Sequence, residues 1–98
     1  MKLRINPIVV EDLKEIREYI AEDNIEKATE IINKIYKKFE LIEKYPSIGS
    51  LLSNRVGFKT NYKYLVWRNY IIIYKATKEY VEIYRVINRH IDITRIFD

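Results

Sequence analysis

The sequence predicts an α+β domain of the order β-α-α-β-β-β, in which a helical hairpin packs on one face of an antiparallel sheet. Two observations carry this prediction. Apolar residues recur every three or four positions from residue 8 to residue 44, as in a helix, and from Gly57 onward they alternate with the period of a strand. A chain of 98 residues is long enough for one core and too short for two, so we expect a single domain over residues 1–98.

The chain opens with a strand and a first helix. Residues 2–6, KLRIN, alternate as a short strand. Asn6 can cap a helix and Pro7 suits the first helical position, which predicts a helix over roughly 8–22. Its apolar stripe is Val9, Leu13, Ile16 and Ile20.

A second helix follows after a short link. Asp23 lies three residues before Glu26, which is the spacing of a capping box, and predicts a helix start near Ile25. The helix is expected to run to Lys44, because the residue before Pro46 is pushed out of the helical conformation. The short link makes the two helices an antiparallel hairpin.

The second half of the chain predicts a three-stranded meander after a loop over residues 47–56. Tyr, Ile and Val dominate these segments, as is typical of strands. The strands are residues 58–67, 70–76 and 80–86, with two-residue turns at Arg68-Asn69 and Thr77-Lys78.

Two-residue turns also assign the faces of this meander, because opposed residues share a side. One face should pack against the helices. The other is too apolar to face solvent, so something must cover it. The first face holds Leu65, Trp67, Tyr70, Ile72, Tyr74, Val81, Ile83 and Ile87, with Arg85 at its far end, and the second holds Tyr62, Tyr64, Val66, Ile71, Ile73, Tyr80, Tyr84 and Val86.

Composition excludes several classes of protein. The chain has no cysteine and one histidine, so we expect no disulfide, no conventional zinc site and no cofactor. It has neither a signal peptide nor an apolar run long enough to span a membrane, which favours a soluble cytoplasmic protein.

The charge is unevenly distributed along the chain. Residues 55–98 hold nine Lys/Arg against four Asp/Glu, whereas residues 1–54 hold nine Lys/Arg against ten Asp/Glu. The basic half indicates an anionic partner, nucleic acid or acidic protein, or only a solvated basic surface.

A candidate functional site lies at the end of the last strand. Arg85, Arg89 and His90 fall within six residues there. Cleavage of RNA requires a base, a proton donor and cations around the phosphate, and these residue types could supply them. The alternative is structural, with the arginines paired to Asp92 and Asp98.

The element order, the Tyr45-Pro46…Gly49 link, NYIIIYKA (69–76) and YRVINRHIDITRIF (84–97) together resemble the RelE/ParE superfamily of type II toxin–antitoxin toxins. The resemblance implies a toxin that arrests growth and stabilises plasmids. It also implies an acidic antitoxin that wraps around the toxin in a hetero-oligomer. The antitoxin is then expected to bind the tyrosine-rich face, at Tyr62, Tyr64, Ile71, Ile73, Tyr80 and Tyr84.

Two departures from the superfamily pattern bear on the cellular target. The last-strand signature R-V-L-H-x-R-x-D has Asn88 in place of its histidine and His90 in place of its second arginine. Ile71 stands where members that cleave mRNA carry a basic residue. These departures favour the ParE-like branch, which poisons DNA gyrase, over a RelE-like endoribonuclease that cleaves mRNA on the ribosome. A third possibility is an inactive interaction module, so whether the chain is an enzyme is left open.

Overall fold

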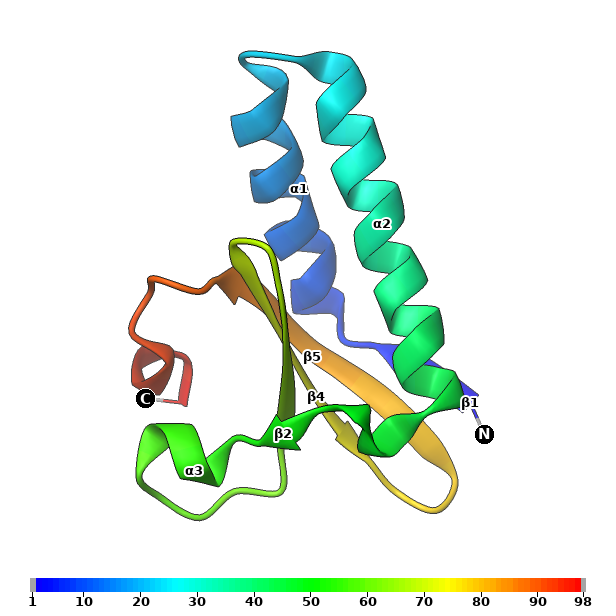
Figure 1. Ribbon diagram of the computed structural model, residues 1–98, viewed down its shortest axis with the longest axis vertical. Coiled ribbons are helices and arrows are strands. Elements are labelled where there is room, and N and C mark those ends of the chain that lie inside the picture. The colour runs from blue at the N-terminus through cyan, green and yellow to red at the C-terminus, as the bar shows by residue number, and fades with distance from the viewer. Residues whose placement is uncertain (1, 98) are drawn as a thin grey trace.

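The structure is a computed structural model that describes residues 2–97, and it has a five-stranded sheet at its centre (Figure 1). The strands lie in the order β1-β5-β4-β3-β2. Strand β1 joins β5 in parallel and the other neighbours are antiparallel, so the sheet is mixed where an antiparallel one is predicted. The predicted α+β class is confirmed, and the predicted β-α-α-β-β-β order holds once the two-residue strand β2 and the short helix α3 (Ser53–Val56) are added before the final three strands. The bounds are β1 Lys2–Ile5, β2 Ser50–Leu51, β3 Lys63–Trp67, β4 Tyr70–Ala76 and β5 Tyr80–Asn88.

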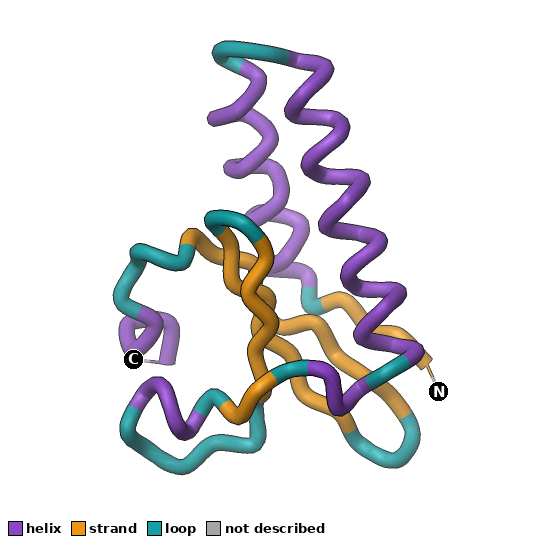
Figure 2. Tube along the Cα trace, in the orientation of Figure 1, coloured by secondary structure: helices purple, strands orange, loops and turns teal. Residues whose placement is uncertain are grey.

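The helical hairpin consists of α1 (Pro7–Ala21) and α2 (Ile25–Lys44), which rise together from one face of the sheet (Figure 2). Asn6 caps α1, with its side-chain oxygen accepting a hydrogen bond from the Ile8 N–H at 3.1 Å. The cap of α2 is Asn24 and not the predicted Asp23, because the Asn24 side chain accepts from the Lys27 N–H at 3.0 Å.

The hairpin and the sheet enclose the larger hydrophobic core. Both helices contribute the apolar stripes that their spacing predicts, and β4 and β5 contribute the facing side chains. The fully enclosed members are Val9, Leu13, Ile31, Ile35, Phe39, Ile42, Ile72, Tyr74, Val81, Ile83 and Val86.

The opposite face of the sheet is covered by the chain itself. The segment predicted as a loop over residues 47–56 instead forms three short elements: η1 (Pro46–Ile48), β2 and α3 (Ser53–Val56). A further short helix, η2 (Ile93–Phe97), follows β5. In Figure 1, α3 and η2 lie away from the hairpin. Phe97 of η2 contacts Phe58, which follows α3, with ring centres 5.7 Å apart. Together α3 and η2 enclose a second apolar cluster of Leu52, Ile71, Ile73, Ile87 and Ile93.

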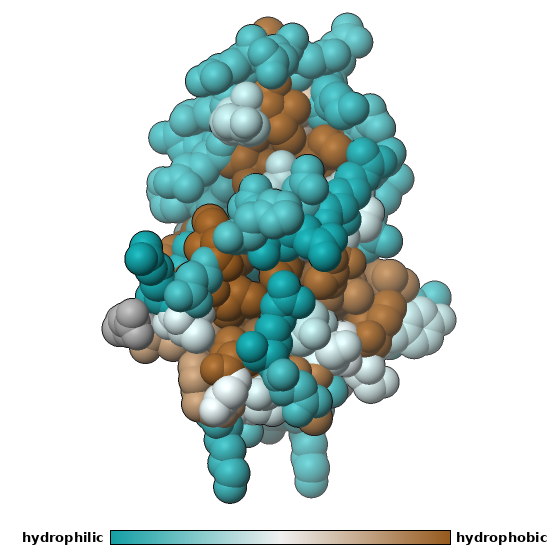
Figure 3. Space-filling view, turned by 60° about the vertical axis from the view of Figure 1, so that its left-hand side comes forward, coloured by the Kyte–Doolittle hydropathy of each residue, from teal (hydrophilic) through white to brown (hydrophobic). Residues whose placement is uncertain are grey.

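The surface reflects this arrangement. In Figure 3, which turns the left side of Figure 1 forward, hydrophilic side chains cover the outer surfaces of the helices. Hydrophobic side chains remain visible between the helices and across the middle of this face. Several large apolar residues on the hairpin are accordingly exposed, among them Val10 at 58% and Tyr36 at 43%.

A β-bulge in β5 changes which side chains face the hairpin. Tyr74 pairs with Ile83 but Ile73 pairs with Arg85, so Tyr84 is an extra residue. Beyond the bulge the alternation is shifted by one position. Val86 therefore packs on the hairpin side and Ile87 in the second cluster, which reverses the predicted faces of these two residues.

The two hairpin turns of the meander differ from each other. Trp67 pairs with Tyr70, which confirms the two-residue turn at Arg68-Asn69. In the second turn the Thr77 N–H donates to the Tyr80 carbonyl at 2.8 Å, so the turn residues are Lys78-Glu79, one position later than predicted.

Tyr74 anchors η1 to the sheet. Its hydroxyl donates to the Pro46 carbonyl at 2.7 Å and accepts from the Gly49 N–H at 2.8 Å. Burial raises the pKa of Tyr74, so the phenol stays protonated and able to donate at neutral pH. One side chain from β4 thus fixes the link between α2 and β2.

Candidate functional site

Arg85 of β5 forms a buried ion pair with Asp12 of α1. Its Nε and Nη2 donate to the two carboxylate oxygens, each at 2.9 Å, and the side chains are 19% and 8% exposed. The Val86 N–H donates to the same carboxylate at 3.0 Å. The hydrogen bonds that Arg85 donates to Asp12 raise the pKa of Arg85. This pair joins the first helix to the last strand, and the guanidinium that was predicted to reach solvent faces α1 instead.

A hollow of about 350 Å³ opens above this ion pair, between α1 and the end of β5. Glu15 and Tyr19 of α1 line one side, and Asn69, Tyr70 and Asn88 line the other. Asp12 and Arg85 neutralise each other, so Glu15 is the carboxylate that remains for an occupant. The lining therefore favours hydrogen-bonding or cationic groups over a phosphate.

Arg89 and His90 lie on the exposed turn that follows β5. The Arg89 N–H donates to the Asn69 carbonyl at 2.8 Å, and its Nη1 donates to the Arg68 carbonyl at 3.3 Å. The His90 N–H donates to the Asn88 side chain at 2.9 Å. Arg89 therefore rests against the β3–β4 turn, whereas Arg85 faces α1, so the three predicted site residues do not converge on one point.

Among the residues that the structure describes, Asp92 forms no ion pair with either arginine. Asp92 accepts from the Thr94 hydroxyl and N–H at 2.7 and 3.0 Å, which lowers the pKa of Asp92. The prediction that Asp92 orients an arginine is therefore wrong. Asp98 lies outside the described residues.

The predicted antitoxin-binding residues fall into two groups. Ile71 and Ile73 are fully buried beneath Leu52 and Ile93, so a partner cannot touch them in this conformation. The prediction that something covers this face is confirmed, and the cover consists of α3 and η2 of the same chain.

The four tyrosines of that set are only half-buried. Tyr62 stacks on Tyr84 with ring centres 4.8 Å apart, beside Phe97. The other two lie under cations. The Arg55 guanidinium is 5.3 Å from the Tyr64 ring, and that of Arg4 is 3.9 Å from the Tyr80 ring. The accessible part of the predicted surface is therefore aromatic and cationic.

Asp12 is the important residue that the sequence analysis missed. It lies three residues after Val9 and four before Ile16, on the stripe that packs against the sheet. A carboxylate on the apolar face of a helix is itself a signal, because a buried charge requires a partner. Arg85, predicted to lie on the helix-facing side of the last strand, is the cation that could have been matched to this carboxylate.

Residues 2–97 meet the requirements of neither a metal cluster nor a membrane-spanning helix. They contain no group of three or more His, Asp or Glu side chains placed to hold a metal ion. No helix in that range has both the length and the hydrophobicity to cross a membrane.

Comparison with known proteins assigns the family. Residues 3–93 match the family model described as "ParE toxin of type II toxin-antitoxin system, parDE". A solved structure, "Chromosomal ParDE TA system from P. aeruginosa", has the same fold with a TM-score of 0.74 at 15% sequence identity. The match covers 90% of this chain and 95% of that one. No curated protein matches significantly. The chain belongs to the ParE family of type II toxin–antitoxin toxins.

Proposed function

We propose that this toxin arrests growth by poisoning DNA gyrase and not by cleaving mRNA. The main observation behind the proposal is that Arg85 donates two hydrogen bonds to the Asp12 carboxylate. Bound bidentately to a carboxylate, the guanidinium is not free to hold a scissile phosphate. Arg89 remains exposed and rests against the Arg68 carbonyl, whereas the Arg85 guanidinium lies against α1, so the two cations do not converge as catalysis of phosphate cleavage requires.

The position of Ile71 supports the same proposal. In the superfamily pattern this residue replaces a cation of the mRNA-cleaving members, and here it is fully buried in the second cluster. No cation from this strand position can therefore reach a phosphate.

Two parallel assays test the proposal. With purified gyrase and relaxed plasmid, the toxin should inhibit supercoiling and accumulate cleaved DNA, whereas mRNA on translating ribosomes should stay intact. Ribosome-dependent cleavage without an effect on gyrase would assign the RelE-like activity. Inactivity in both assays, together with normal growth on induction, would indicate an interaction module.

Arg89→Ala separates a functional from a structural role of this exposed arginine. We expect the variant to lose growth arrest while melting within about two degrees of the wild type, because surface changes cost under roughly half a kcal/mol. Arg95→Ala, which removes another exposed cation from the C-terminal segment, is the matched control and should still arrest growth. Full toxicity of Arg89→Ala would contradict the prediction.

We further propose that an acidic antitoxin neutralises the toxin by docking on the half-buried tyrosines Tyr62, Tyr64, Tyr80 and Tyr84. The excess of Lys/Arg over residues 55–98 supports an acidic partner, and Arg55 and Arg4 beside these rings provide its charge complement. Arg55→Glu should weaken the complex and reduce its dependence on salt, as measured by titration calorimetry at two ionic strengths. Unchanged affinity would place the antitoxin elsewhere.

A further inference from the structure

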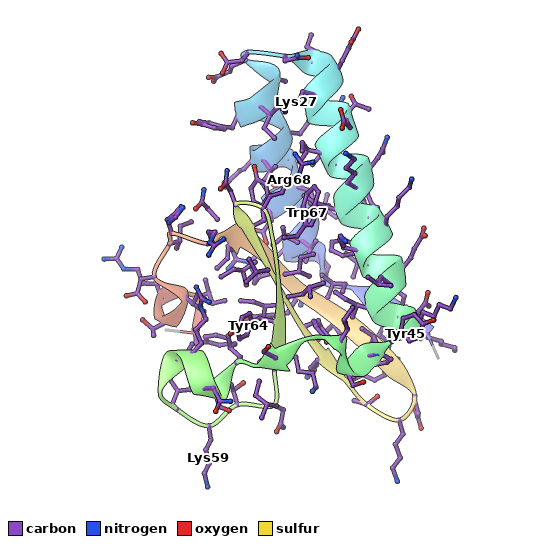
Figure 4. The ribbon with its side chains drawn as sticks, viewed as in Figure 1. Lys27, Tyr45, Lys59, Tyr64, Trp67 and Arg68 are labelled. Carbon is purple, nitrogen blue, oxygen red and sulfur yellow. The ribbon has the colours of Figure 1, made fainter. Side chains whose placement is uncertain are left out.

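A second hollow, of about 300 Å³, lies between α2 and the β3–β4 turn on the outer side of the hairpin. Three lysines of α2 and Arg68 of the turn line it, together with the indole of Trp67. Figure 4 shows Trp67 and Arg68 beside the hairpin, with Lys27 higher on α2. We call Lys27, Lys34, Lys37, Lys38 and Arg68 the α2 basic face.

Helical spacing places these lysines in a row. Lys27, Lys34 and Lys38 are seven and four residues apart, so they lie along one side of α2. At 1.5 Å per residue the row is roughly 16 Å long. Duplex DNA presents a phosphate on each strand about every 3.4 Å of axis, so the row spans several phosphates.

The β3–β4 turn places Arg68 beside the lysines of α2. Arg68 has a φ of +54°, a left-handed conformation that directs the chain back into β4. Its guanidinium lies 5.0 Å from the Trp67 ring centre. Arg89 donates to the Arg68 carbonyl, so a further cation rests against this turn.

The positive charge of this face is only partly neutralised. Glu30 pairs with Lys34 at 2.8 Å. The hydrogen bond and charge of Lys34, with the charges of Arg68 and Lys27, lower the pKa of Glu30. Within residues 2–97, Lys37, Lys38 and Arg68 form no ion pair.

We infer that the α2 basic face binds the sugar-phosphate backbone of duplex DNA without sequence preference. The lining favours nucleic acid over an acidic protein, because it contains four cations and one indole but no aliphatic side chain against which an amphipathic helix could pack. It favours a duplex over a single strand, because Trp67 is half-buried and covered by Arg68, so no unpaired base can stack on it. A rigid row of cations suits the regular backbone of a duplex.

This inference is independent of the proposed target. It concerns direct binding of DNA by the isolated toxin, with no gyrase present. The toxin could poison gyrase without touching DNA, and it could bind DNA without poisoning gyrase. The two proposals therefore fail separately.

Fluorescence anisotropy with a labelled 20-base-pair duplex tests the inference across a range of salt concentrations. Contact with about four phosphates predicts a slope of log K against log salt near −3.6, and a loss of affinity on the order of 100-fold between 50 and 200 mM salt. The triple variant Lys37→Ala/Lys38→Ala/Arg68→Asn should flatten the slope by about 2.7, at 0.9 per lost contact. Asparagine is used at position 68 because it tolerates the left-handed conformation.

The control variant Lys14→Ala/Arg17→Ala/Lys78→Ala removes the same charge from exposed positions elsewhere and should bind as the wild type does. Melting curves establish that both triple variants are folded. If the control variant lost as much DNA affinity as the α2 variant, net charge alone would explain the binding, and the inference would be overturned. So would an unchanged slope in the α2 variant, or tighter binding of a polyglutamate peptide or of the single strand than of the duplex.

Discussion

Replacing Asp12 with alanine is expected to destabilise the toxin by about 3 kcal/mol, the lower end of the range for a buried pair, because the Arg85 side chain loses its partner but is still 19% exposed. The Val86 N–H loses its acceptor in the same step. For a domain of this size we expect the melting temperature to fall by more than about 10 °C, measured by circular dichroism. Arg85→Ala should cost a similar amount, since it strands the carboxylate instead.

Two control variants separate the pair from general effects on α1. Glu15→Ala removes an exposed carboxylate one turn away and should change the melting temperature by only a few degrees. The double variant Asp12→Leu/Arg85→Met replaces both charges with apolar side chains and should recover most of the loss. A double variant no more stable than Asp12→Ala would contradict our account of the pair as a mutual neutralisation.

Gly49→Ala is expected to destabilise the toxin by about 1–3 kcal/mol, the usual range for overpacking. A Cβ at this position would lie 2.5 Å from the Tyr74 hydroxyl and 2.8 Å from the Tyr64 carbonyl oxygen. The hydroxyl cannot move away without breaking its hydrogen bonds to Pro46 and Gly49. Urea denaturation of the variant and the wild type measures the difference.

Tyr74→Phe is the companion variant, because it removes the hydroxyl and keeps the ring. In the Gly49→Ala background it should cost less than it does in the wild type, since the closest clash is then gone. Strict additivity of the two changes would show that the Tyr74 hydroxyl does not limit the space at position 49, which leaves the Tyr64 carbonyl and the retained Tyr74 ring, each 2.8 Å from the added Cβ.

The sequence predicted those parts of the fold whose cause is local. The start at Asn6-Pro7, the stop before Pro46 and the strand Tyr70–Ala76 follow from capping, proline geometry and alternation, and the structure confirms all three. The cap of α2 was misplaced by one residue because Asp23 and Asn24 can both accept a backbone hydrogen bond, and only the path of the chain selects between them.

The remaining features depend on contacts between distant segments. The bulge at Tyr84 has no signature in the strand's own residues, and it moved Val86 and Ile87 to opposite faces. The cover over Ile71 and Ile73 comes from α3 and η2, and the sequence predicted no helix for residues 93–97. The partner of Arg85 lies 73 residues away, and although Asp12 on the apolar stripe of α1 signals a buried charge, its position does not say which cation pairs with it.

The parallel pairing of β1 with β5 determines the order in which the toxin can assemble during synthesis. Lys2 pairs with Tyr80 and Ile5 with Ile83, so β1 has no partner strand until β5 has been made. The Asp12–Arg85 pair closes at the same late stage. Contacts between such distant residues slow folding. The five-stranded sheet and its ion pair to α1 therefore cannot be complete until β5 has been translated.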